Sequence, residues 1–125
     1  MNNQIKIALL QYRGNSSNSY TGRKEGAQAR AEISLDTKDQ DDLIYQFIVP
    51  NNTTALNPSF FLGMFYKSIK KLGIKKFEYK YSLVLNESDP KAKEQLEIDI
   101  SEGKRHALNQ MKSGGGLRHF IQNFK

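Results

Sequence analysis

The stretch Leu43–Gly73, LIYQFIVPNNTTALNPSFFLGMFYKSIKKLG, carries the clearest structural signal in the chain. Its beginning, Leu43–Val49, is almost continuously apolar and rich in β-branched and aromatic side chains. Such a run is typical of a strand that is covered on both faces. The segment Pro50–Pro58 follows, and its proline, asparagine and threonine residues predict a loop. We therefore expect a buried strand that leads through a loop into a helix.

The helix predicted over Ser59–Leu72 has the most regular apolar periodicity in the sequence. Its apolar residues at helical spacing predict one buried face; they are Phe61, Met64, Phe65, Ile69 and Leu72. Asn57 is suited to be the N-cap and Pro58 the first helical residue, whereas Gly73 ends the helix. Ser59 would then lie beside backbone N–H groups that lack an intrahelical partner. A phosphate on Ser59 would be stabilised there, although serine is also ordinary at a helix start.

The segment before this stretch predicts one strand and one helix. Apolar residues alternate with polar or small ones over Gln4–Gln11, which indicates a strand. A polar cluster over residues 14–20 predicts a loop. Residues Arg23–Leu35 favour a helix, with Ala27, Ala31 and Leu35 on its buried face and Thr21 as a candidate cap.

The segment after the stretch continues the alternation of strands and helices. Apolar residues at every second position predict a half-buried strand over Phe77–Leu85. Residues 90–111 predict a third helix, weakened or broken near Gly103. The order strand, helix, strand, helix, strand, helix predicts an α/β fold with a small, mostly parallel sheet. We expect one domain over residues 1–112, followed by a glycine hinge and a basic amphipathic tail over residues 113–125.

Length and composition exclude several classes of protein. The chain has 125 residues, 38% of them hydrophobic and 26% charged, which fits one globular domain and argues against overall disorder. It has no cysteine, so disulfides, thiolate nucleophiles and thiolate metal sites are excluded. No apolar run is long enough to span a bilayer, and the N-terminal residues lack the pattern of a signal peptide. These features predict a soluble, cytoplasmic protein without a membrane role.

The charges are unevenly distributed. The net charge is +6, and it favours acidic partners without specifying one. A basic patch is predicted from the lysines of one stretch: Lys67, Lys70, Lys71, Lys75 and Lys76. These lysines and Arg118 of the tail make nucleic-acid binding the alternative function, although charged runs are usually solvated surface. The acidic segment Asp36–Asp42 is interpreted as a solvated connection.

The sequence contains no recognisable catalytic set. No phosphate-binding loop or nucleophile–base pair is apparent, and the acidic segment lacks the spacing of a divalent-ion loop. His106 and His119 are interpreted as ordinary histidines rather than metal ligands or acid–base groups. We therefore predict no catalytic residue, no metal site and no cofactor, and classify the protein as non-enzymatic.

Two motifs resemble a known bacterial family. Leu43–Gly73 resembles the core of STAS-type domains, the anti-sigma-factor antagonists, in which a partner kinase phosphorylates a serine at the helix start after a buried strand. More narrowly, SSNSYTGRKEGAQAR at residues 16–30 and NPSFFLGMF at residues 57–65 resemble the bacterial STAS-like family of unknown function. In that family an Arg–x–x–Gly stretch opens one helix and a Ser–Phe pair opens the next. In this sequence the Arg–x–x–Gly stretch corresponds to Arg23 and Gly26, and the Ser–Phe pair to Ser59 and Phe60. The resemblance spans about residues 16–90.

The resemblance implies a function as well as a fold. Members of such families are regulatory modules that bind protein partners, among them kinase-like ATP-binding proteins. We accordingly expect a protein-binding module in which Ser59, Asn57 and Arg23 form the phosphoacceptor site or the partner contact.

Overall fold

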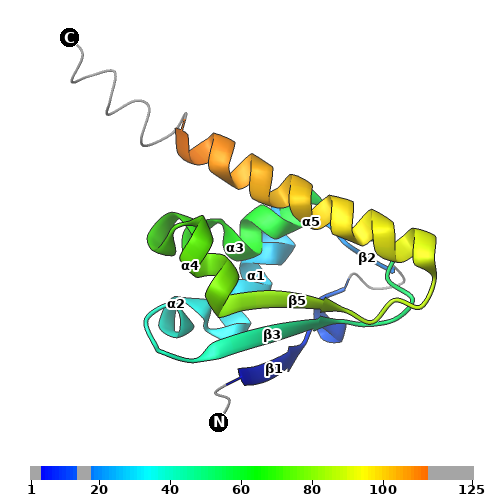
Figure 1. The fold of residues 1–125 in the computed structure, drawn as a ribbon, viewed down its shortest axis with the longest axis horizontal. Coiled ribbons are helices and arrows are strands. Elements are labelled where there is room, and N and C mark those ends of the chain that lie inside the picture. The colour runs from blue at the N-terminus through cyan, green and yellow to red at the C-terminus, as the bar shows by residue number, and fades with distance from the viewer. Residues whose placement is uncertain (1–3, 14–17, 113–125) are drawn as a thin grey trace.

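Three parallel strands form the main sheet of the protein (Figure 1). The computed structural model describes residues 4–13 and 18–112, so the predicted glycine hinge and tail at residues 113–125 lie outside the described residues. The strands of this sheet, in spatial order, are β1 (Gln4–Ala8), β3 (Ile44–Val49) and β5 (Tyr81–Leu85). A smaller parallel pair consists of β2 (Ser19–Tyr20) and β4 (Ala55–Leu56). The prediction of an α/β fold with a small parallel sheet is confirmed.

Helices connect the strands and lie along one side of the main sheet (Figure 1). The helical elements are the 3-10 turn η1 (Leu10–Tyr12) and the α-helices α1 (Arg23–Ile33), α2 (Leu35–Lys38), α3 (Pro58–Leu72), α4 (Ile74–Lys80) and α5 (Pro90–Met111). The first predicted strand is therefore shorter than expected, because β1 ends at Ala8 and η1 follows.

The hydrophobic core lies between this helical layer and one face of the sheet. Along β3 the buried residues Tyr45, Phe47 and Val49 alternate with half-buried ones. The Phe47 ring meets Phe65 of α3 edge to face, with ring centroids 5.4 Å apart. The prediction that this strand is covered on both faces is wrong, since its second face is only half-buried within the described residues.

Helices α1 and α3 are in close contact through two glycines. A Cβ atom on Gly26 would lie 2.2 Å from the carbonyl oxygen of Phe60, and one on Gly63 would lie 2.1 Å from that of Arg23. Only glycine permits this approach of the two backbones. The face of α1 predicted from Ala27 and Ala31 is wrong, because both are exposed. The residues of α1 that are buried instead are Gly26, Ala29, Arg30 and Ile33.

The start of α1 also differs from the prediction. Its N-cap is Gly22 rather than Thr21, and no side chain caps the helix. Gly22 has a φ of 95°, a conformation that favours glycine over residues with a side chain.

The strand predicted over Phe77–Leu85 is half helix. Helix α4 runs to Lys80, and only Tyr81–Leu85 is a strand. Phe77 and Tyr81 are four residues apart, a spacing that suits a helix face and a strand face equally well. Tyr79, which the strand pattern would bury, is 74% exposed.

Helix α5 continues without a break through Gly103, contrary to the expected weakening. Gly103 is buried against Phe61 of α3, and a Cβ atom there would lie 2.5 Å from Cγ of that ring. This glycine therefore allows α5 to pack closely on α3.

Candidate functional site

The start of α3 has the arrangement that the sequence predicts. Asn57 is the N-cap, and its Oδ1 accepts a hydrogen bond of 2.9 Å from the Phe60 N–H. Its carbonyl oxygen accepts one from the Phe61 N–H, at 3.1 Å. Pro58 has no N–H, so the Ser59 amide is the remaining donor of this first turn without a partner in the described structure. Ser59 is exposed and lies in the first turn, at the positive end of a fifteen-residue helix.

The chain that enters α3 is held by its neighbours. The Asn57 N–H donates to the Tyr20 carbonyl at 3.0 Å, as a continuation of the β2–β4 pair. The Leu56 N–H donates to Asp99 Oδ2 of α5, also at 3.0 Å. The position of Ser59 is therefore fixed from both sides, by β2 and by α5.

The loop before β4 is fixed by two charged side chains. Nη1 of Arg13 donates to the carbonyl oxygen of Asn52 at 3.1 Å and to Oγ1 of Thr53 at 3.0 Å. Oε1 of the buried Glu87 accepts from the Thr53 N–H at 2.9 Å. The loop that leads through β4 to α3 is thus held in a defined conformation.

Arg23 does not join Asn57 and Ser59. Its Nη2 donates to Oε1 of Gln110, near the end of α5, at 3.0 Å. No hydrogen bond links Arg23 to either of the other two residues, all of which are described. Of the three residues predicted for this site, the structure brings together the two that are close in sequence.

The predicted basic patch is an exposed surface on the second half of α3 and on α4. All of its lysines are exposed, namely Lys67, Lys70, Lys71, Lys75 and Lys76. Three of them, Lys67, Lys70 and Lys71, line a shallow hollow of about 670 Å³ with Arg30, Asp36 and Gln40. Lys71 and Lys76 also line a neighbouring hollow of about 420 Å³. In the larger hollow three lysines and Arg30 outnumber the one acidic residue, Asp36, and this excess of positive charge favours an acidic ligand.

A buried ionic cluster, which the sequence analysis missed, lies beneath this surface. Arg30 is 6% exposed, and all five of its N–H donors are bonded, to Asp36, Asp39, Ser68 and the Met64 carbonyl. Asp39 accepts from Arg30 Nη2 at 2.8 Å, from the Ser68 hydroxyl at 2.7 Å and from the Tyr81 hydroxyl at 2.6 Å. We call Arg30, Asp36, Asp39, Ser68 and Tyr81 the Arg30 cluster.

The Arg30 cluster corrects in part the interpretation of Asp36–Asp42 as a solvated connection, because Asp39 is buried whereas Asp36 and Asp42 are exposed. Helix α2 begins this segment, and the Asp39 side chain is fully buried. Burial, and then the bond to Asp39, raise the pKa of Tyr81 well above its ordinary value. One sequence signal was available, because Arg30 lies four residues after Gly26 and three before Ile33, on the face that is buried.

A second ion pair, between the buried Lys80 and the half-buried Asp41, joins α4 to the same segment. The Lys80 ammonium donates to Asp41 Oδ1 at 2.6 Å and to the carbonyl oxygens of Asp41 and Leu43 at 2.7 and 2.9 Å, so its three protons are all used. The Tyr45 hydroxyl also donates to Asp41. Burial, and then this bond, raise the pKa of Tyr45 to about 12. Lys80 therefore belongs to the core rather than to the basic patch.

Asp41 should make the stability of the protein sensitive to acid. Burial alone would raise the pKa of this carboxyl, but the hydrogen bonds from Lys80, Tyr45 and the Leu43 N–H outweigh it and lower the pKa below the ordinary 3.8. A lowered pKa in the folded state contributes stability above about pH 4, and this contribution is lost as the pH falls through the folded-state value. Asp41→Asn should therefore cost about 1–2 kcal/mol at pH 7, and progressively less below pH 4.

Urea unfolding curves of the wild type and Asp41→Asn between pH 3 and 7 would measure this difference. A gap between the two proteins that stays constant over the whole range would contradict the role given to the Asp41 charge.

The described residues show neither a metal cluster nor a membrane-spanning helix. No group of three or more His, Cys, Asp or Glu side chains there is placed to hold a metal ion. None of the helices in this part of the chain is long and apolar enough to cross a bilayer. His106 is exposed on α5, 3.8 Å from Glu102, whereas His119 lies outside the described residues.

Comparisons of the chain with protein-family models, with curated proteins and with solved structures find no match.

Proposed function

We propose that the protein is a non-enzymatic regulatory module that binds a protein partner through the segment Pro50–Asn57, which includes β4, and through the start of α3. The observation that carries this proposal is the placement of Ser59, exposed at the positive end of a capped helix that follows a fixed loop. The resemblance of the Ser59–Phe60 pair to the helix start of STAS-like domains supports the same site. We place this module in the bacterial cytoplasm, with a kinase-like ATP-binding protein as the candidate partner.

Phosphorylation of Ser59 would act as the switch. A phosphate adds about −1.5 to −2 charges and three strong hydrogen-bond acceptors. The Ser59 amide, which has no hydrogen-bond partner among the described residues, and the helix dipole would stabilise that charge, while the same charge would change the surface offered to the partner. The bonds that fix Asn57 and Thr53 do not involve the Ser59 hydroxyl, so modification would leave the fold intact.

The stability of two variants tests the geometry of this site. Ser59→Asp places a negative charge in the first turn of α3 and should stabilise the protein by about 0.3–1 kcal/mol. Asn57→Ala removes the cap and should cost about 1 kcal/mol. Urea unfolding followed by circular dichroism would measure both changes. A clear loss of stability in Ser59→Asp would contradict an accessible Ser59 at this helix start.

Affinity capture from cells that make the protein tests the function. The full chain and its Ser59→Ala and Ser59→Asp variants serve as baits, and mass spectrometry quantifies the captured proteins and any phosphate on Ser59. Ser101→Asp, an acidic change at an exposed serine of α5, is the matched control. We expect at least one protein to be recovered differently with Ser59→Asp and equally with the control. Equal recovery with all baits would count against the proposal.

Nucleic-acid binding is the second candidate, because all the lysines of the basic patch are exposed and three of them border one hollow. A mobility-shift titration from about 50 mM salt upward tests it, since the phosphate contribution is strongest at low salt. The triple variant Lys67→Gln, Lys70→Gln, Lys71→Gln should weaken binding and reduce its salt dependence. Absence of a shift at the lowest salt would exclude this candidate.

A further inference from the structure

Among the described residues, β5 is an edge strand whose outer backbone groups have no hydrogen-bond partner. It pairs with β3 on one side only. The Asn86 N–H donates to the Val49 carbonyl at 2.9 Å, which fixes the direction of the backbone groups along β5. Because successive residues of a strand direct these groups to opposite sides, those of Val84 point to β3 and those of Leu83 and Leu85 point away. No described residue hydrogen-bonds the outward groups of Leu83 and Leu85.

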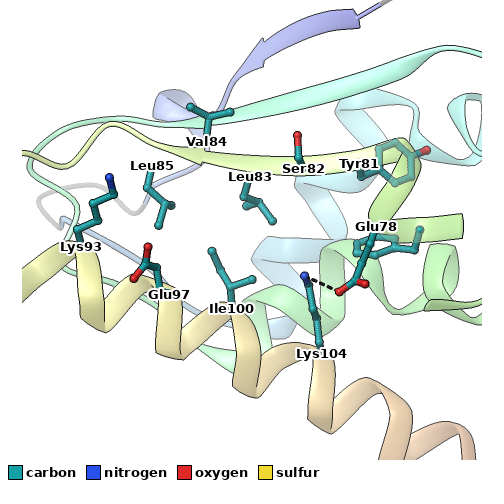
Figure 2. A pocket seen from close by; sticks show the side chains of 11 residues that line it. Glu78, Tyr81, Ser82, Leu83, Val84, Leu85, Lys93, Glu97, Ile100 and Lys104 are labelled. Carbon is teal, nitrogen blue, oxygen red and sulfur yellow. Dashed lines mark hydrogen bonds and ion pairs between the residues drawn. The ribbon is translucent and has the colours of Figure 1, made fainter. Parts of the chain in front are cut away.

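A groove runs along this edge, between β5 and α5. Its volume is about 500 Å³. Figure 2 shows the side chains of Leu83 and Leu85 directed towards Ile100 of α5, whereas Ser82 and Val84 point to the other face of the sheet. Lys93 and Glu97 of α5 lie along the groove, and the ion pair of Lys104 and Glu78, 2.9 Å long, closes one end. The groove therefore combines an apolar floor with unpaired backbone donors and acceptors.

An extended chain is the kind of ligand that satisfies both features of the groove. Its backbone can pair with Leu83 and Leu85, and alternate side chains can enter the apolar floor. The β5 edge of a second copy is a poorer fit, since that strand has its own α5 beside it. Unpaired strand edges are otherwise a liability, because they promote aggregation.

The sequence that follows α5 contains a segment suited to this place. Residues 117–125, LRHFIQNFK, include Phe120 and Phe124, which would share one face of an extended strand. Met111, the last residue of α5, lies about 10 Å beyond Lys104 along the helix axis. The intervening residues 112–116 span up to about 17 Å when extended, and three of them are glycines that permit a reversal of direction. The segment can thus reach the groove at its Lys104 end.

We propose that Leu117–Lys125 of the same chain adds to the edge of β5 as a further parallel strand, with Phe120 and Phe124 in the groove. Helix α5 runs from the carboxyl end of β5 back towards its amino end, so a returning segment would run in the direction of β5. This contact is separate from the start of α3, and it holds or fails independently of the proposed function.

Hydrogen exchange of the Leu83 and Leu85 amides, measured by NMR on the full chain, tests the proposal. We expect exchange at both amides to be at least about tenfold slower in the wild type than in the double variant Phe120→Asp, Phe124→Asp. The double variant Phe120→Leu, Phe124→Leu keeps apolar side chains and should retain the slow exchange. The Val84 amide, which faces β3, serves as the internal reference because it should be unaffected.

Two results would overturn the proposal. One is fast exchange at Leu83 and Leu85 in the wild type, unchanged by the aspartate substitutions. The other is slow exchange that disappears on tenfold dilution together with a change from dimer to monomer in sedimentation, because the occupant would then belong to a second copy.

Discussion

Replacing Asp39 by alanine is expected to lower the free energy of unfolding by about 3–5 kcal/mol. The Asp39 carboxylate is fully buried and accepts hydrogen bonds from Arg30, Ser68 and Tyr81. Its removal leaves the Arg30 guanidinium, itself only 6% exposed, without its buried counter-charge. It also leaves two buried hydroxyl groups without this acceptor, and each such loss is costly. Such a loss is large compared with the total stability of about 5–15 kcal/mol of ordinary domains.

Urea unfolding of Asp39→Ala, followed by far-UV circular dichroism, would measure this loss. Asp42→Ala is the matched control, since Asp42 is an exposed aspartate three residues away and should change stability by less than about 0.5 kcal/mol. Similar stabilities for Asp39→Ala and Asp42→Ala would show that the Arg30 cluster does not form as described.

Replacing Gly63 by alanine should destabilise the protein by about 3 kcal/mol, although alanine is the better helix former. The new methyl group would lie 2.1 Å from the Arg23 carbonyl oxygen and 2.9 Å from the Ala27 nitrogen. Both are backbone atoms, so no side chain can move aside, and α1 would have to shift away from α3. Gly26→Ala would cause the reciprocal clash with Phe60 and should have a similar effect.

Thermal unfolding of the two glycine variants would measure the effect of the close contact. Gln28→Ala, at an exposed position of α1, controls for helix propensity and should be close to neutral. A gain of stability in Gly63→Ala, as propensity alone predicts, would contradict the close approach of the two helices.

The central strand and α3 could be predicted from the sequence because each has a single strong pattern. The apolar run before Pro50, the Asn57–Pro58 start and the stop at Gly73 all indicate the same boundaries, and the structure has them. The prediction of a strand over Phe77–Leu85 failed in its first half, because the apolar residues there fit the period of a helix as well as that of a strand. Phe77 and Tyr81 suit both a helix and a strand, and the junction between α4 and β5 lies between them.

Long-range pairing explains the features that the sequence could not supply. Arg30 is buried against Asp39 and Ser68, and Asp39 in turn accepts from Tyr81, so the cluster joins distant parts of the chain. From the local sequence alone, a charged residue such as Arg30 is expected to be exposed to solvent. Similarly, helix propensity alone makes Gly26 and Gly63 unfavourable residues in a helix. Their role becomes clear only from the structure, in which α1 and α3 are in close backbone contact at these two positions. The sequence predicted Asn57 as the N-cap and Ser59 in the first turn because these positions are set by neighbours in sequence, whereas it could not predict the contact of Arg23 with the distant Gln110.

The distribution of rigid and accessible features suits a binding module. The Arg30 cluster and the Asp41–Lys80 pair fix the end of the sheet from which β3 and β5 begin. The start of α3 lies beyond the other end of β3, where the loop is held by Arg13 and Glu87 while Ser59 is exposed. A surface that is already ordered loses little entropy when a partner binds.

The location of the partner contact tests this account most directly. Hydrogen exchange with mass spectrometry would compare the full chain alone and in complex with the protein whose capture depends on Ser59. We predict slower exchange in the complex for peptides covering residues 50–62, with the basic patch and the β5–α5 groove unchanged. Unchanged exchange over residues 50–62, with protection confined to the basic patch or to the groove, would contradict the assignment of the binding surface to the start of α3.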